Sequence, residues 1–167
     1  MKIENPAAFP YFMGKEIYLL PSDKEVLQNI AIVIPEVQEV VVSFNYSGNN
    51  KKNFLVLTNY TDADFISPNH SVALESTLKR LGFEMDDLAI LNIAKYPDIV
   101  FDDLIKFFEP NKILILGKSA QPETKIPVLL NKIAIHGNIK ILTTFSFEEM
   151  MDNTGNKKVF WELMKQL

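Results

Sequence analysis

The chain has 167 residues, of which 47% are hydrophobic, so it is long enough to bury a sizeable core within one domain. Its net charge of −4 and its single arginine argue against strong direct binding to the phosphate backbone of nucleic acids. Cysteine is absent, which excludes disulfides, thiolate nucleophiles and thiolate metal sites. The N-terminus lacks the apolar core of a signal peptide, and no apolar run approaches the ~20 residues that span a bilayer, so we expect a cytoplasmic protein without membrane contact.

Residues 1–28 differ from the rest of the chain and predict an N-terminal arm. Large apolar side chains alternate here with three prolines and one glycine, and no period of 2 or 3.6 residues is sustained. Because exposed apolar patches usually mark interaction sites, we interpret the arm as a partner-binding segment. Its candidate contact residues are Phe9, Tyr11, Phe12, Tyr18 and Leu20.

Residues 29–167 predict a single α/β domain. Two β-branched runs, Ile30–Ile34 and Val40–Phe44, are strand-like. Three further predicted strands each end in polar or glycine-containing residues and are each followed by a helical pattern: Asn53–Tyr60, Leu88–Lys95 and Lys112–Lys118. They are continuously apolar rather than alternating, which is typical of parallel strands covered on both faces. With crossover helices over residues 69–81 and 98–108, the pattern predicts a three-layer α/β/α fold with a short, mainly parallel central sheet.

The last third of the chain predicts a hairpin and two helices. Lys132–His136 and Ile139–Thr143 flank the turn residues Gly137 and Asn138. Ser146 and Glu149 have the spacing of a capping box that opens a short helix. A final helix from about Asn156 has apolar residues at Phe160, Leu163, Met164 and Leu167, which we expect to dock on the core. Trp161, on the same helix, is a further candidate for partner contact.

Polar residues at the strand ends are the candidates for chemistry. Asp62 and Asp64 follow the first strand of the parallel series, where two carboxylates could hold Mg²⁺ or could simply be solvated. Gly117, Lys118 and Ser119 resemble the end of a phosphate-binding loop, but Lys112 occupies the position of its first glycine. A glycine that permits a turn is the better interpretation.

The two histidines are the other titratable candidates. His70 and His136 have no metal-ligand spacing, and no G-x-S-x-G elbow indicates a serine hydrolase. We expect a surface or capping role for both. The sequence therefore predicts no catalytic residues, no metal and no cofactor.

Four passages of the chain form a recognisable series that brackets about residues 29–163. They are Asn29–Pro35; Ala73–Leu81 leading through Asp86–Leu88 into Ile90–Ile93; the region from Ser146; and Asn153–Leu163. The most distinctive passage is the last, in which an asparagine precedes an apolar residue and a tryptophan at a fixed distance. In this order the passages resemble the psi subunit of bacterial DNA polymerase III, a small non-catalytic protein that ties the chi subunit to the clamp loader.

The resemblance implies a fold like that of uracil-DNA glycosylases, without their active site, and a connector function with a clamp loader and a chi-like subunit as partners. Val40–Asn53 departs from the family as an insertion, and the arm shows no residue-by-residue match. No Gly-x-Asp-Pro-Tyr motif occurs, since neither Asp62 nor Asp64 precedes Pro-Tyr. The alternative is a small glycosylase-like or nucleotide- or phosphate-binding protein with a site at the strand ends. Its ligand-binding residues would be Asn59, Asp62, Asp64, Gly117, Lys118 and Ser119.

Overall fold

The computed structural model describes residues 43–167. The predicted arm with its five apolar residues and the predicted strand Ile30–Ile34 lie outside the described residues. The strand predicted over Val40–Phe44 is wrong for the two positions that are described. Ser43 and Phe44 form an irregular segment, and no strand of the described sheet pairs with them. The Phe44 ring lies in an aromatic cluster, stacked 5.7 Å from Phe108 and edge-on 5.3 Å from Tyr96.

The described residues form a five-stranded sheet in the order β2-β1-β3-β5-β4. Strands β1, β2, β3 and β5 pair in parallel, and β4 runs antiparallel to β5 at one edge. The three predicted parallel strands are confirmed as neighbours, with Val56 opposite Ile90 on one side and Leu114 on the other. Each is shorter than predicted. The bounds are β1 Phe54–Thr58, β2 Leu88–Asn92, β3 Lys112–Leu116, β4 Lys132–His136 and β5 Ile139–Thr144.

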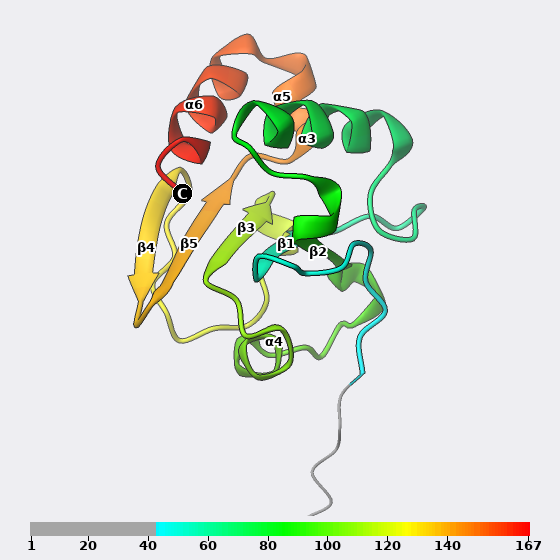
Figure 1. The fold of residues 1–167 in the computed structure, drawn as a ribbon, viewed down its shortest axis with the longest axis vertical. Helices are drawn as coiled ribbons and strands as arrows, with labels where there is room; N and C mark the ends of the chain where they lie inside the picture. Colours follow the sequence, from blue (N-terminus) through cyan, green and yellow to red (C-terminus); the bar gives the residue numbers. More distant parts are fainter. Residues whose placement is uncertain (1–42) are drawn as a thin grey trace, which may run out of the picture. The chain divides into compact units, whose positions relative to one another are not determined.

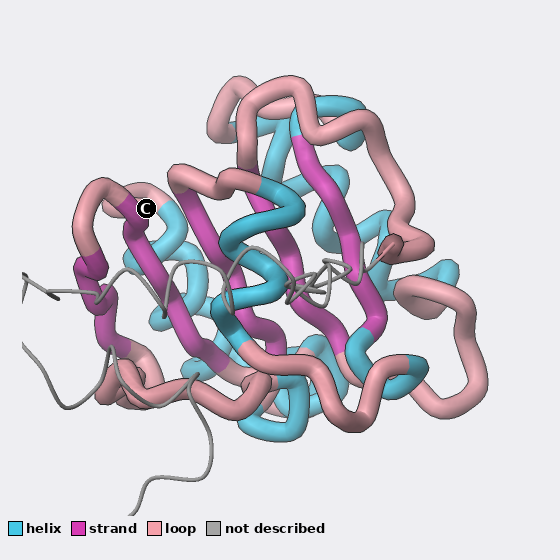
Figure 2. The backbone as a smooth tube through the Cα atoms, turned by 90° about the horizontal axis from the view of Figure 1, so that it is seen from below, coloured by secondary structure: helices cyan, strands magenta, loops and turns pink. Residues whose placement is uncertain are grey.

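Helices cover both faces of this sheet, which gives the predicted three layers (Figures 1 and 2). On one face lie α3 (Pro68–Arg80), α5 (Phe147–Asp152) and α6 (Thr154–Met164). On the other face lies α4 (Phe101–Phe108), together with irregular segments. α3 and α4 are the expected crossovers from β1 to β2 and from β2 to β3. The structure thus confirms a general α/β fold.

The core is divided between the two faces by the two-residue period of the strands. In β1, Phe54 and Val56 pack towards α3, α5 and α6, whereas Leu55 and Leu57 pack towards α4. All five residues of β1 are buried. Burial on both faces explains why the strand sequences are continuously apolar.

Two helix starts differ from the sequence prediction. α4 begins at Phe101 rather than at residue 98, because Val100 is extended and the Phe101 N–H donates to the Glu123 carbonyl at 3.1 Å. α6 begins at Thr154, where the Asn153 side chain accepts from the Gly155 N–H at 2.8 Å. The capping box of α5 is confirmed: Ser146 Oγ accepts from the Glu149 N–H, and Glu149 Oε2 accepts from the Ser146 N–H.

The two edges of the sheet differ in their backbone pairing. Residues 47–50 run along the outer edge of β2, where Ser47 exchanges backbone hydrogen bonds of 3.0 and 2.8 Å with Ile90. β4, in contrast, has a neighbouring strand on one side only within the described sheet.

None of the helices in the described part of the chain has the length and apolar run needed to cross a bilayer.

Candidate functional site

The carboxyl ends of β1 and β3 meet at the point where the strand order reverses. The chain leaves β1 for β2 on one side, and it leaves β3 for β4 and β5 on the other. Open α/β sheets usually bind ligands at such a switch point. Two predicted residues meet here: the Asn59 Nδ2 donates to the Ser119 carbonyl at 2.6 Å and so ties the two loops together.

A cavity of about 480 Å³ opens beside this contact. Its volume lies within the ~300–1,000 Å³ range of small-molecule sites. The turn after β2 and the loop after β3 supply most of the wall, which combines amide, hydroxyl and carboxylate groups with apolar side chains. The polar lining residues are Asn59, Tyr96, Asp98, Ser119, Gln121 and Glu123.

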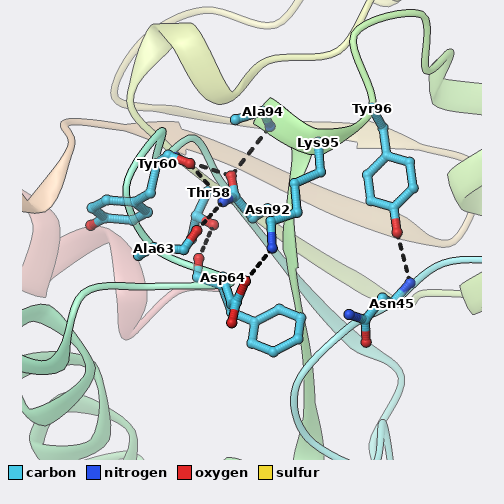
Figure 3. A network of polar contacts seen from close by, with 10 residues as sticks. Asn45, Thr58, Tyr60, Ala63, Asp64, Asn92, Ala94, Lys95 and Tyr96 are labelled. Atoms are coloured by element: carbon cyan, nitrogen blue, oxygen red, sulfur yellow. Dashed lines mark hydrogen bonds and ion pairs between the residues drawn. The ribbon is translucent and has the colours of Figure 1, made fainter.

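Asn92, at the end of β2, is the most completely bonded polar side chain near this edge (Figure 3). Its Oδ1 accepts from the backbone N–H groups of Tyr60 (3.0 Å) and Ala94 (3.2 Å). Its Nδ2 donates to the carbonyls of Tyr60 (2.8 Å) and Ala63 (2.9 Å). Since the residue is 1% exposed and all four bonds go to backbone, the amide fixes the loop after β1 and has no bonding capacity left for a ligand.

Two more polar side chains at this edge, those of Thr58 and Asp64, are also bonded within the fold. Thr58 Oγ1 donates to the Phe65 carbonyl at 2.5 Å. Asp64 forms an ion pair with Lys95, and the hydrogen bond from that ammonium holds the pKa of the Asp64 carboxyl below its usual value. Asp62 is exposed. No group of three or more potential metal ligands occurs among residues 43–167.

His70 lies on the opposite side of the loop, in the first turn of α3. Its Nδ1 is 2.7 Å from the Tyr60 hydroxyl, and its ring stacks on Phe147 at 5.5 Å. Burial, with smaller contributions from the Glu148 and Asp62 charges, raises the pKa of Tyr60 to about 12. The phenol therefore stays protonated at neutral pH. His70 thus packs at the helix start rather than capping it, which differs from the surface or capping role expected from the sequence. His136 is exposed and ends β4 next to the hairpin turn.

Gly117 makes a turn rather than a phosphate cradle. Its φ of +91° with ψ of 149° is a conformation that is essentially restricted to glycine. An added Cβ would lie 3.1 Å from the Ser146 Cβ. Lys118 and Ser119 continue into a single 3₁₀ turn, Lys118–Ala120, instead of the helix whose N-terminus holds phosphate in a P-loop. The turn interpretation made from the sequence fits this geometry.

Trp161 lies on α6. Its partly buried indole has Arg80 at 5.9 Å and Lys165 at 5.6 Å from the ring centre. Phe160, Met164 and Leu167 are buried as predicted, and Leu163 packs partly buried against the same core. The docking of the last helix on the domain is confirmed.

Sequence reasoning located Asn59 and Ser119 correctly at one edge but missed Asn92, Tyr96 and Gln121. A signal for Asn92 existed, because a polar residue that closes an otherwise apolar buried strand must find partners. Tyr96 and Gln121 carry no comparable signal.

No family model matches the sequence, and a search of curated proteins finds no matching relative.

Proposed function

We propose that the protein is a non-catalytic connector of the DNA polymerase III psi type, which joins a clamp loader and a chi-like subunit through protein–protein contacts. The glycosylase-like version of the α/β fold belongs to the same proposal. The passages of sequence described above support it, and the chemistry of the strand ends supports its non-catalytic part.

The observation that carries the proposal is that the polar side chains at the strand ends are bonded to other groups of the fold. In an enzyme of this architecture, these side chains would face a substrate and would have nucleophile, base and electrophile within reach of one another. Here Asn92 bonds four backbone groups, Asp64 pairs with Lys95, and Asn59 bonds the Ser119 carbonyl. These groups hold loops in place.

The direct experiment mixes the purified full-length protein with the purified clamp loader and chi subunit of the same organism and measures complex formation by analytical gel filtration. A stable complex that contains all three components is expected. A variant that lacks residues 1–21 should lose the clamp loader while it keeps the thermal transition of the domain. If the full-length protein elutes alone in every mixture, the connector function is wrong.

Catalytic assays test the same proposal from the other side. Purified protein should neither excise uracil from DNA nor hydrolyse nucleoside triphosphates. Turnover that disappears in Asp62→Asn or Asp64→Asn would establish an enzyme and overturn the connector.

The cavity beside Asn59 favours one second candidate, a small-molecule or nucleotide binder. Its volume and its mixed polar lining suit a ligand of that size. Thermal-shift measurements with nucleosides and nucleotides test this candidate. Stabilisation that is lost in Asn59→Ala and kept in Asn69→Ala, an exposed asparagine on α3, would support it.

A further inference from the structure

A second cavity, of about 210 Å³, lies between α3, α5 and α6. Three positions of α3 at helical spacing form one wall: Ala73, Thr77 and Arg80. Lys157 and Trp161, four residues apart on α6, form the opposite wall. We call this cavity the α3–α6 groove.

The floor of the α3–α6 groove is apolar and adaptable. Met150 and Phe160 are buried beneath it, and the side chain of Met151 is 43% exposed at its border. Methionine side chains adjust to different partners because they are unbranched and polarizable. The volume is below the ~300–1,000 Å³ typical of small-molecule sites, so one large apolar side chain of a partner fits the groove better than a free metabolite.

The rim of the α3–α6 groove is positively charged. Arg80 and Lys157 are both exposed, and neither takes part in an ion pair within residues 43–167. No acidic side chain lines the groove among the described residues. On α3 and α6, Glu75 pairs with Lys79 and Glu162 with Lys165, each at 2.7 Å. α5 also carries Glu148, Glu149 and Asp152, but none of them lines the groove.

The two cations at the rim contrast with the net charge of −4 of the whole chain. The chain's only arginine stands beside its only tryptophan, with the guanidinium 5.9 Å from the indole centre. Tryptophan and arginine are the residue types most enriched at binding hot spots. A carboxylate that binds at the rim would pair with two cations that have no acidic partner among the described residues.

We propose that the α3–α6 groove binds an acidic peptide segment of a partner protein, with one large apolar side chain inserted between α3 and α6. The inserted side chain packs on Met150, Phe160 and Trp161. Carboxylates on either side of it meet Arg80 and Lys157. This inference rests on the proposed connector function and specifies the chemistry of one of its partners.

The test uses the full-length protein and a labelled synthetic peptide of aspartate and glutamate around one central phenylalanine. Anisotropy should show saturable binding that weakens as salt is raised, because exposed charges are screened. The same titration should shift the emission of Trp161, the only tryptophan of the chain. A peptide with alanine in place of phenylalanine should bind about tenfold more weakly, and one with lysine in place of the acids should not bind.

Variants locate the binding. Arg80→Glu and Lys157→Glu should each weaken binding by about tenfold or more, since they place like charges at the rim. Lys106→Glu, at an exposed lysine on α4 across the sheet, is the matched charge control and should bind as wild type. Arg80→Gln removes the charge without reversing it, and circular dichroism checks that each variant is folded.

Several outcomes would overturn the inference. They are no binding of the acidic peptide, equal binding by Arg80→Glu and wild type, or equal loss in Lys106→Glu. A dimer in gel filtration that Arg80→Glu dissociates would assign the groove to a second copy of the chain. Single-stranded DNA that displaces the peptide would assign it to nucleic acid.

The two proposals fail separately. If the clamp-loader complex forms but the peptide does not bind, the α3–α6 groove inference alone is wrong. If the peptide binds but no clamp-loader complex forms, the groove inference keeps its binding chemistry and the psi-type connector function is wrong.

Discussion

The strand-end edge and the α3–α6 groove both carry polar or charged side chains, but these side chains differ in whether they have partners within the fold. At the strand ends, Asn92 spends all four of its hydrogen-bonding positions on backbone groups, and Asp64 is paired with Lys95. In the groove, Arg80 and Lys157 have no carboxylate partner among residues 43–167, and Trp161 is only partly covered.

The comparison teaches that the position of polar residues in an α/β fold does not reveal their role. Strand ends are the usual location of a ligand site, yet the side chains of Asn59 and Asn92 there are bonded to backbone groups of the fold. Charged and aromatic groups without an internal partner are the ones available to another molecule. Substitutions in the two regions test this difference between bonded and unpartnered side chains.

The largest expected effect comes from Asn92→Ala. The substitution leaves two N–H groups and two carbonyls of the loop after β1 without their partner, and each buried unsatisfied group costs about 1–3 kcal/mol. Because water reaches part of the loop, we expect the free energy of unfolding to fall by about 3 kcal/mol in urea titration. Asn69→Ala, at an exposed asparagine, should change it by less than about 0.5 kcal/mol. A loss no larger than in this control would mean that Asn92 is not structural.

Gly117→Ala should have the second-largest effect. The backbone conformation at Gly117 is nearly forbidden to alanine, which costs about 1–3 kcal/mol, and the new Cβ would press on Ser146. Gly137→Ala is the matched control, because its φ of +58° is tolerated at a cost of about 1 kcal/mol and a Cβ there meets no atom within 4 Å. Thermal unfolding should rank the two variants in this order. The reverse order would contradict the conformation described at Gly117.

Asp87 should give a smaller effect that depends on pH. The Lys52 ammonium at 2.8 Å, followed by the Glu84 N–H, lowers the pKa of the Asp87 carboxyl in the folded state. A lowered pKa stabilises the fold above the unfolded-state value of about 3.9, and this contribution is lost as pH falls through the folded-state pKa. The difference in unfolding free energy between wild type and Asp87→Asn should therefore shrink from pH 7 to pH 3. A difference that is constant with pH would show that the ion pair does not stabilise the fold.

The smallest change concerns the environment of Trp161 in the native protein. Its partly buried indole should emit at shorter wavelength than in water, and the emission should move to longer wavelength on unfolding. Fluorescence spectra of native and urea-unfolded protein check this. Water-like emission from the native state would contradict the docking of α6.

Much of the fold could be predicted because the signals are local. The apolar runs of β1, β2 and β3, the Ser146–Glu149 capping box and the hairpin turn at Gly137 each follow from neighbouring residues. The start of α4 was missed because it depends on the hydrogen bond between Phe101 and Glu123, which are distant in sequence.

The candidate sites were harder to predict for the same reason. Asn59 and Ser119 could be assigned to the strand ends, but the sequence does not show that Asn92 is saturated by backbone groups. The α3–α6 groove depends on how three helices pack, so Arg80 could not be placed beside Trp161 from spacing alone.

One measurement tests the division between the two regions most directly: NMR chemical-shift mapping of ¹⁵N-labelled protein during titration with the acidic, phenylalanine-containing peptide. We predict that the shifted amides cluster on α3, α5 and α6 around Arg80, Lys157 and Trp161, while those of Asn59, Asn92 and Ser119 stay unchanged. Shifts concentrated at the strand ends would contradict the account, because they would place binding at the edge that we assign to structure.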